Sequence, residues 1–237
     1  MEIFVCKYSD KGGRSSNEDA VGISDNIFVL ADGLGGHSFG EVASSKAVEY
    51  LLGRTEISDI SSNTMHDIID EVNRYIWREK AADSSYGDMA STVVAAFVRD
   101  GYFNYFNVGD SRMYYFRNGK IFIQSKDHSM TQLSVDMGEI SREKMRFHED
   151  RNKLTKVLGL RENLKINQSF EPFKIMHDDA FLLCSDGFWE YISEKQMIKS
   201  LNKSKTPNKW LETMLKIILH KVKEGNDNLS AVCGMVK

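Results

Sequence analysis

The sequence has few of the residues and patterns that mark linkers, membrane spans and exported proteins. Only 2 of its 237 residues are proline and 17 are glycine, so no segment has the composition of a linker. No apolar run approaches the roughly 20 residues that a helix needs to cross a bilayer. The N-terminus lacks the basic start and apolar stretch of a signal peptide. We therefore predict a cytoplasmic protein without membrane insertion.

Neither sign of charge is in large excess. The 31 Lys and Arg residues against 34 Asp and Glu residues give a formal net charge of -3, which provides no electrostatic reason to expect nucleic acid or an anionic membrane as a partner. Hydrophobic residues make up 41% and charged residues 27%, ordinary values for a soluble globular protein. The length suits one large domain or two small ones with a sizeable core.

Cysteine is scarce, and its placement argues against thiol chemistry and zinc. Cys6, Cys184 and Cys233 lie far apart and form no C-x-x-C pair. Each lies in an apolar, strand-like stretch, which favours a small buried side chain. Cys184 is followed by Ser-Asp-Gly and not by the arginine-ended loop of a cysteine phosphatase. The chain also has no H-E-x-x-H, G-x-S-x-G or G-x-x-x-x-G-K-[ST] motif.

An aspartate at the end of an apolar run is the most informative local feature. Residues 27–31 form this run and are predicted to be a buried strand; Asp32 ends it, and four glycines follow within eight residues. The pattern places a carboxylate at a strand end, beside backbone that allows a ligand to approach closely. Taken alone, Asp-Gly after a strand is more often an ordinary turn than a metal site.

The same placement of acids recurs along the chain, which changes that interpretation. Acidic residues stand at the boundaries of the strands predicted over 21–24, 180–184 and 229–236. Oxygen ligands without cysteine or paired histidine favour Mg²⁺ or Mn²⁺ over zinc. Together with Asp32, these acids are Glu18, Asp19, Asp186 and Asp227.

Arg14 precedes Glu18 by four residues. An arginine beside metal-facing acids could bind a phosphate through two hydrogen bonds, whereas the alternative is a solvated loop of mixed charge. Carboxylates around two ions roughly 3.5–4 Å apart would lower the pKa of a bridging water and place it for in-line attack on phosphorus. Such chemistry requires no protein nucleophile. Spacing alone does not show that the acids meet in space.

Periodicity predicts helices over 40–52, 64–80 and 129–137, a helix starting at the capping box of Ser193, and a final helix from Thr206 that ends before Gly225. Strand-like runs over 92–98, 102–108, 113–117 and 120–124, with Asp-Gly and Asn-Gly turns, predict an antiparallel meander. The weakly periodic segment of about 128–159 is predicted to be a mobile flap beside the site. Its histidines, His128 and His148, are predicted to be structural or surface residues.

Seven motifs follow one another along the chain in the same order as in a known protein family. Over essentially its whole length the chain resembles bacterial metal-dependent protein serine/threonine phosphatases, the PPM or type 2C family. The motifs are residues 9–19, 31–37, 108–112, 127–129, 152–159, 184–187 and 227–228.

This resemblance implies an α+β fold in which residues 1–237 form a single domain. The fold is a four-layer αββα sandwich, with two mainly antiparallel β-sheets packed face to face and helices outside. It also implies a binuclear centre of Mn²⁺ or Mg²⁺, two ions per site, at one edge of the sandwich.

The resemblance assigns roles residue by residue. Asp32 would bridge the two ions and Gly33 would offer its backbone carbonyl. Asp186 and Asp227 would complete the shell of one ion, and Glu18 would act through water, supported by Asp19. Arg14 would bind the substrate phosphate, while Asp110 and Asn228 are supporting or structural residues.

Two departures from the family pattern matter. Many eukaryotic relatives have a histidine directly after the bridging Asp-Gly, a candidate general acid, but this chain has Leu34, and nearby His37 has no assigned role. Bacterial relatives usually have Gly-Thr-Thr where this chain has residues 90–92, and a preceding acid there can hold a third metal. Asp88 is the nearest candidate for a third ion.

The resemblance implies hydrolysis of phosphoserine and phosphothreonine by metal-activated water. Phosphoproteins would be the substrates, and a cognate Ser/Thr kinase and its targets would be the partners. A bacterial anti-sigma-type regulator is another substrate class with the same chemistry. The alternative is a non-catalytic regulatory or phospho-binding module that keeps the fold, although clustered acids without a cation would cost stability.

Overall fold

The fold contains two antiparallel β-sheets, which the computed structural model describes over residues 1–237 apart from 35–38, 55–58, 161–162, 167, 169 and 223. The first sheet has five strands in the spatial order β1 (Ile3–Asp10), β11 (Leu229–Val236), β10 (Ala180–Cys184), β7 (Arg112–Arg117) and β8 (Lys120–Gln124). The second has the order β2 (Asp19–Ile23), β3 (Ile27–Leu34), β5 (Val93–Arg99), β6 (Tyr102–Val108) and β9 (Phe173–Lys174), with β4 (Ala90–Ser91) paired to β3.

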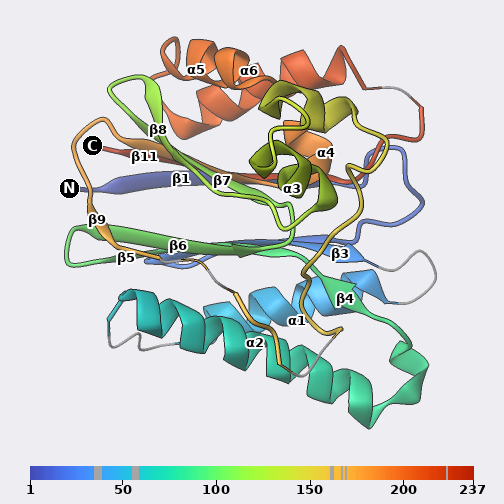
Figure 1. Cartoon of the computed structure of the whole chain (residues 1–237). Coiled ribbons are helices and arrows are strands. Elements are labelled where there is room, and N and C mark those ends of the chain that lie inside the picture. The colour runs from blue at the N-terminus through green and yellow to red at the C-terminus, as the bar shows by residue number, and fades with distance from the viewer. Residues whose placement is uncertain (35–38, 55–58, 161–162, 167, 169, 223) are drawn as a thin grey trace.

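The sheets pack face to face, and helices cover both outer faces (Figure 1). Helices α1 (Gly40–Leu52) and α2 (Ser62–Ala82) cover the second sheet, while α5 (Glu194–Leu201) and α6 (Pro207–Leu219) cover the first. Apolar residues from both sheets, such as Phe28 and Phe181, form the inner core. This arrangement confirms the predicted four-layer αββα sandwich.

Central strands read as continuous apolar runs because both of their faces are covered. All five residues of β10 are buried, as are all eight of β11. A strand with one face in water would instead alternate apolar and polar residues. The acids that follow or precede such runs therefore lie where the chain leaves the core.

The predicted meander is wrong in its middle. The two hairpins form as expected, with positive φ at both central residues of each turn: 52° and 76° at Asp100 and Gly101, and 51° and 67° at Asn118 and Gly119. However, β6 pairs with β5 and β9, whereas β7 pairs with β8 and β10. Between β6 and β7 the chain crosses from one sheet to the other, so Asp110 lies at a crossing and not in a hairpin.

Helix ends follow local capping chemistry. The predicted capping box at Ser193 is confirmed, and Thr206 caps α6. The predicted start of α2 at Thr64 is wrong by two residues, because the Ser61 side chain accepts the Thr64 N–H and begins the helix earlier. The last helix ends at Leu219, well before Gly225.

The predicted flap contains α3 (Met130–Asp136) and the 3₁₀ helix η2 (Arg142–Phe147). It is tied down by backbone bridges, in which Ser129 pairs with Leu154 and Ser91 pairs with Leu158. His128, at its start, is half-buried, and burial lowers the pKa of His128 to about 4, which fits the predicted structural role. Mobility of the flap stays a prediction.

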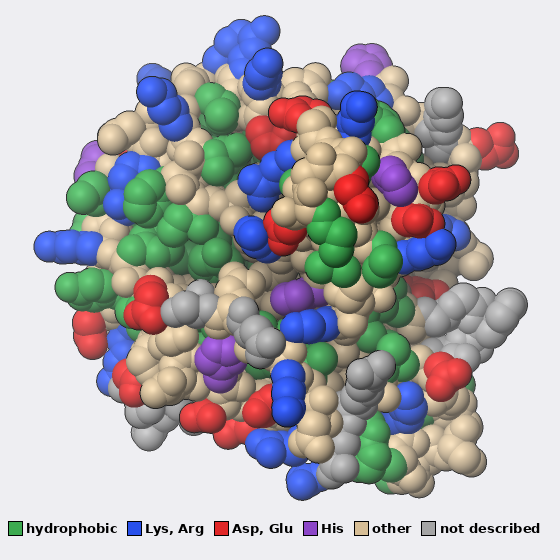
Figure 2. Space-filling model, in the orientation of Figure 1, with side chains coloured by type: hydrophobic (Ala, Val, Ile, Leu, Met, Phe, Trp, Pro, Cys, Tyr) green, Lys and Arg blue, Asp and Glu red, His purple; other side chains and the backbone are tan. Residues whose placement is uncertain are grey.

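The outer surface mixes charges of both signs, in line with the small net charge. Figure 2 shows hydrophobic side chains gathered toward the edge where β8 and β9 lie, and charged side chains spread over the rest of this face. Among the described residues, no helix is both long and apolar enough to cross a membrane.

Candidate active site

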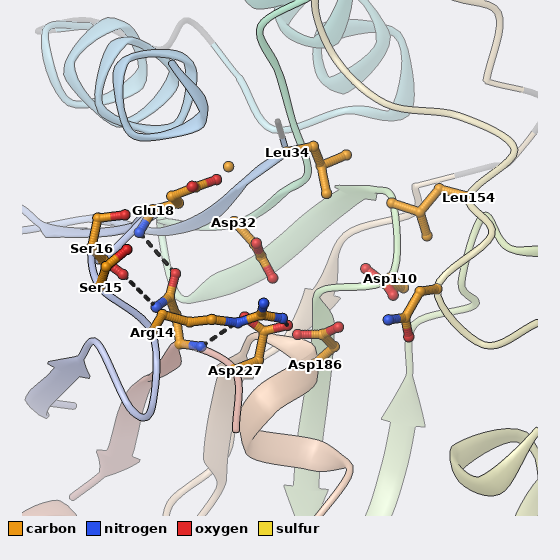
Figure 3. Close-up of a pocket in the computed structure, with 13 residues that line it drawn as sticks. Arg14, Ser15, Ser16, Glu18, Asp32, Leu34, Asp110, Leu154, Asp186 and Asp227 are labelled. Atoms are coloured by element: carbon orange, nitrogen blue, oxygen red, sulfur yellow. Dashed lines mark hydrogen bonds and ion pairs between the residues drawn. The ribbon is translucent and has the colours of Figure 1, made fainter. Parts of the chain in front are cut away.

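A pocket of about 320 Å³ (Figure 3) opens at one edge of the sandwich, and the chain termini lie at the opposite edge (Figure 1). Five segments meet there: the end of β3, the loop after β1, the loop between β6 and β7, the start of α4 (Asp186–Trp189) and the residues before β11. Flap residues Asn152 and Leu154 complete the wall. Five of its lining side chains are carboxylates, namely Glu18, Asp32, Asp110, Asp186 and Asp227.

Asp32 is fixed by backbone contacts on a short strand pair. Its N–H donates to Thr92 Oγ1 (3.1 Å), and its carbonyl accepts from Thr92 N (2.8 Å) and Ser91 Oγ (3.0 Å). The carboxylate is thereby free to face the pocket, as Figure 3 shows. Burial, followed by the nearby charges of Asp19 and Asp186, raises the pKa of Asp32 well above its usual value.

Asp186 and Asp110 face Asp32 from the opposite wall (Figure 3). Asp186 is the first residue of α4, and burial, then the charge of Asp110, raises its pKa well above the usual value. Asp110 is only 5% exposed, and burial followed by repulsion from Asp127 raises its pKa to about 7. Sequence reasoning gave Asp110 a supporting role, but the structure places its carboxylate in the pocket wall.

Asp19 stands directly opposite Asp32 in the β2–β3 register and is buried. Its Oδ2 accepts from Ser185 Oγ (3.0 Å), whereas its Oδ1 has no hydrogen-bond partner among the described residues. Burial raises the pKa of Asp19 to about 6. A buried carboxylate oxygen without a donor costs about 1–3 kcal/mol, so this atom calls for a partner such as a cation or a water.

Glycines allow the walls to approach each other. Gly33 N–H donates to the Glu18 carbonyl (3.0 Å), and a side chain at Gly33 would collide with the Gly40 carbonyl. A side chain at Gly40 would in turn collide with the Glu18 carboxylate. The glycine-rich stretch thus brings α1 and Glu18 against the end of β3.

Arg14 lies on the rim and is the only cation among the described lining residues. Its Nε and Nη2 donate to the two carboxylate oxygens of Asp227 at 3.1 and 2.8 Å (Figure 3). The Arg14 side chain is 54% exposed. The predicted phosphate ligand and a predicted metal ligand are therefore paired with each other in this structure.

Asn228 fastens the loop that carries Arg14 and Glu18. Its Nδ2 donates to the carbonyls of Lys11 and Ser16, both at 2.9 Å, and its Oδ1 accepts from Glu18 N (2.8 Å). One side chain thus ties both ends of the loop to the start of β11.

A buried network holds α4 against the crossing loop. Trp189 Nε1 donates to the Asp110 carbonyl (3.0 Å), and the Arg112 guanidinium lies 3.4 Å above the Trp189 ring. Arg112 also makes two hydrogen bonds to Asp127, at 2.9 and 2.7 Å. From the flap, Arg146 donates to the Trp189 carbonyl (2.5 Å). These contacts hold the loop that carries Asp110 against the helix that carries Asp186, so the two carboxylates face each other.

Not every predicted residue reaches the pocket. The Asp88 side chain is 96% exposed, lies 3.9 Å from Lys80 Nζ and does not line the pocket. Leu34 does line it and offers no proton to a leaving group. His37 lies outside the described residues.

The donor set fits a hard cation in its chemistry: every ionisable ligand candidate is a carboxylate, and their crowding raises several of their pKa values. As they stand, no three acidic, histidine or cysteine side chains in the described part of the chain form a closed metal-binding group. Carboxylates that share no cation repel one another, and Arg14 engages both oxygens of Asp227. The site is therefore an open carboxylate cluster.

Comparisons with known proteins agree on one family. The family described as Protein phosphatase 2C matches residues 10–231. Serine/threonine phosphatase stp of Listeria monocytogenes is 31% identical over 210 residues, covering 84% of this chain and 82% of that protein.

Solved structures agree with the fold. The crystal structure of serine/threonine phosphatase Stp1 from Staphylococcus aureus has a TM-score of 0.86 at 29% identity, covering 100% of this chain and 98% of that one. The catalytic domain of serine threonine protein phosphatase PstP in complex with two manganese ions has a TM-score of 0.84 at 24% identity, covering 99% of both chains. At 24% identity, the likeness to PstP shows a shared fold and no more.

Proposed function

Because the chain belongs to the protein phosphatase 2C family and is a protein serine/threonine phosphatase, we propose that it hydrolyses phosphoserine and phosphothreonine at the carboxylate-lined pocket. The observation that carries this proposal is the gathering of five carboxylates, from segments far apart in the sequence, around one opening. Such a pocket repels a phosphate unless cations occupy it. Its chemistry therefore requires bound cations.

We assign the ligand roles to the residues as predicted. Asp32 would be shared by two ions, and Gly33 would offer its carbonyl. Asp186, Asp227 and Glu18 would complete the shells, and Asp19 would support them from behind. When bound, two Mn²⁺ or Mg²⁺ ions supply an acidified water and offset charge on the phosphate oxygens. The relative PstP, solved in complex with two manganese ions, supports the proposal that two cations bind, without indicating which residues hold them.

Arg14 would hold the substrate phosphate. Its half-exposed position on the rim lets the guanidinium turn from Asp227 toward an incoming phosphate, which it matches with two parallel N–H donors. Asn228 ties the loop that carries Arg14 to the start of β11 and so keeps Arg14 at the rim of the pocket. The proposed substrates are phosphoproteins, and the proposed partners are a Ser/Thr kinase and its targets.

The alternative is a phospho-binding module without catalysis. The raised pKa values in the pocket argue against it, since crowded carboxylates lower stability and a module that binds an anion gains nothing from them. A module would bind phosphopeptide without releasing phosphate.

The test is phosphate release from a phosphothreonine peptide by purified protein with Mn²⁺, with a phosphotyrosine peptide beside it. We expect Mn²⁺-dependent release from phosphothreonine and loss of release in Asp32→Asn. Asp88→Asn, outside the pocket, is the matched control. Binding of the peptide without release in the wild-type protein would support the module instead.

A further inference from the structure

Two of the three cysteines face each other across neighbouring strands. Cys6 of β1 is the register partner of Cys233 of β11. Directly opposed residues of an antiparallel pair project from the same face of the sheet. Both side chains pack into the apolar cluster between the first sheet and α6, which includes Trp210 and Met214. Both thiols are free.

The strand register sets the separation of the pair. Glu2 and Lys237 exchange both backbone hydrogen bonds, each 2.9 Å long. Because such pairs recur with a period of two, Cys6 and Cys233 are also a hydrogen-bonded pair, with Cα atoms about 5.5 Å apart. Disulfide-bonded residues have Cα separations of about 4.4–6.8 Å, so the backbone is within range.

The Cβ atoms must move closer for a bond to form. Opposed strand residues have Cβ atoms about 4.5–5.5 Å apart, and a disulfide needs about 3.5–4.5 Å. β1 is an edge strand of the first sheet, so it can shift toward β11 without breaking hydrogen bonds to a second strand. The resulting strain would make the bond easy to reduce.

The two thiols differ in access and acidity. Cys6 is half-buried on the edge strand and Cys233 is fully buried. Hydrogen bonding by Cys233 lowers the pKa of Cys6 despite the opposing effect of burial, and burial raises the pKa of Cys233. Cys6 is therefore the thiol that forms a nucleophilic thiolate and that a small oxidant reaches first.

We propose that Cys6 and Cys233 form a reversible oxidation site at which hydrogen peroxide closes a cross-strand disulfide. The Cys6 thiolate attacks one peroxide oxygen, the O–O bond breaks, and the leaving hydroxide takes a proton to become water. The Cys233 thiol then attacks the sulfur of the Cys6 sulfenic acid, the S–O bond breaks, and a second water leaves. The two thiols together supply the two electrons that reduce one peroxide.

The third cysteine is poorly placed to compete. Cys184 opposes Ala231 in the β10–β11 register, so it lies diagonally from Cys233. Diagonal neighbours are about 7–8 Å apart, beyond the reach of a disulfide. Cys184 is also fully buried. It therefore provides a matched control variant.

The bond would join strands at the two ends of the chain. Linking Cys6 to Cys233 closes a loop over nearly the whole sequence, and a longer loop restricts the unfolded chain more strongly. Oxidation should therefore raise the thermal unfolding midpoint by several degrees, and dithiothreitol should reverse the rise. This inference does not depend on the proposed catalytic activity.

The experiment treats the reduced protein with hydrogen peroxide and maps its peptides by mass spectrometry without reduction. We expect a Cys6–Cys233 linked peptide, two fewer free thiols per chain and a higher unfolding midpoint, all reversed by dithiothreitol. Cys184→Ala should keep all three results, and Cys6→Ala on the edge strand should lose them.

Sulfinic or sulfonic acid at Cys6 with Cys233 still reduced would overturn the proposal, as would a disulfide between two chains. An equal rise in unfolding midpoint in Cys6→Ala would do the same. Phosphate release is measured on the same samples. An inactive protein that forms the bond would refute only the proposed function, and an active protein that never forms it would refute only the oxidation site.

Discussion

The two ends of the sandwich treat enclosed carboxylates in opposite ways. At the end opposite the pocket, Asp179 is 1% exposed and accepts hydrogen bonds from Arg117 Nη2 (2.7 Å), Tyr115 Oη (2.8 Å) and Met176 N (2.8 Å). At the pocket, Asp32, Asp110 and Asp186 face one another, and the Arg14 guanidinium on the rim is bound to Asp227.

The difference separates a structural carboxylate from a functional one. A carboxylate that is buried with a full set of donors holds its neighbours in place. Carboxylates crowded without donors lower stability and raise one another's pKa. Such an arrangement is expected at a functional site, where a ligand supplies the missing positive charge. At the pocket, the lack of a hydrogen-bond donor to the buried Asp19 Oδ1 among the described residues is therefore as informative as the presence of acids.

The largest expected effect comes from the pocket end. Asp186→Asn should lower kcat/KM for a phosphothreonine peptide with Mn²⁺ by about 10³-fold, the scale on which loss of one group that stabilises transition-state charge acts. The same change should raise the unfolding midpoint of the metal-free protein, because it removes a repelling charge. Activity within twofold of the wild type would place Asp186 with the structural acids.

At the opposite end of the sandwich, a substitution should lower stability and leave activity unchanged. Arg117→Met leaves Asp179 buried without its cation and should reduce the free energy of unfolding by about 3–5 kcal/mol, with kcat/KM unchanged in protein that is still folded. Arg99→Met removes a surface ion pair with Asp100 and should cost at most about 1 kcal/mol. Urea unfolding compares the two variants, and equal effects would contradict a structural role for the Arg117–Asp179 pair.

His128 should make the stability of the folded protein depend on pH, and the direction of this effect is known. Its pKa is about 4 in the folded protein, below the usual 6.5, because burial disfavours the charged ring. As pH falls below about 6.5 the unfolded chain takes up a proton that the folded protein refuses, so stability present above this pH is lost progressively toward pH 4, by about 3 kcal/mol in total.

His128→Gln isolates this contribution, since its side-chain oxygen can accept the Gly109 N–H that His128 Nδ1 accepts now, at 3.3 Å. Pocket acids with raised pKa values change stability in the opposite direction over this range and are common to both proteins. The difference in unfolding free energy between wild type and variant should shrink as pH falls. A difference independent of pH would show that His128 does not titrate in this way.

The smallest effect is expected outside both ends. Asp88→Asn changes an exposed acid 3.9 Å from Lys80, so phosphate release should stay within twofold of the wild type and the free energy of unfolding within about 0.5 kcal/mol. A loss of activity or of bound Mn²⁺ in this variant would return Asp88 to the site.

Local patterns predicted the parts of the site that lie at strand ends. Asp32, Asp186 and Asp227 stand beside apolar runs, and the structure brings all three to one pocket because those runs are central strands. Asp110 was placed among supporting residues by the family resemblance, and no strand pattern showed that its carboxylate would line the pocket. Sheet membership of β6 and β7 is decided by packing between layers, which turn residues do not encode.

Contacts between segments far apart in the sequence also could not be predicted from local patterns. The pairing of Arg14 with Asp227 spans nearly the whole chain, and no local spacing predicts it. The four-layer fold came from a resemblance across seven motifs, whereas composition and periodicity alone supported a globular chain with helices and strands. The missing donor to Asp19 Oδ1 depends on how the layers meet, so only a structure reveals it.

Calorimetric titration of Mn²⁺ into metal-free wild-type protein and Asp32→Asn tests the central claim most directly, namely that the open carboxylate cluster is a cation site shared through Asp32. We predict that the wild-type protein binds more than one Mn²⁺ per chain and that Asp32→Asn, folded by circular dichroism, loses at least one of these ions. Unchanged stoichiometry and affinity in Asp32→Asn would contradict the claim.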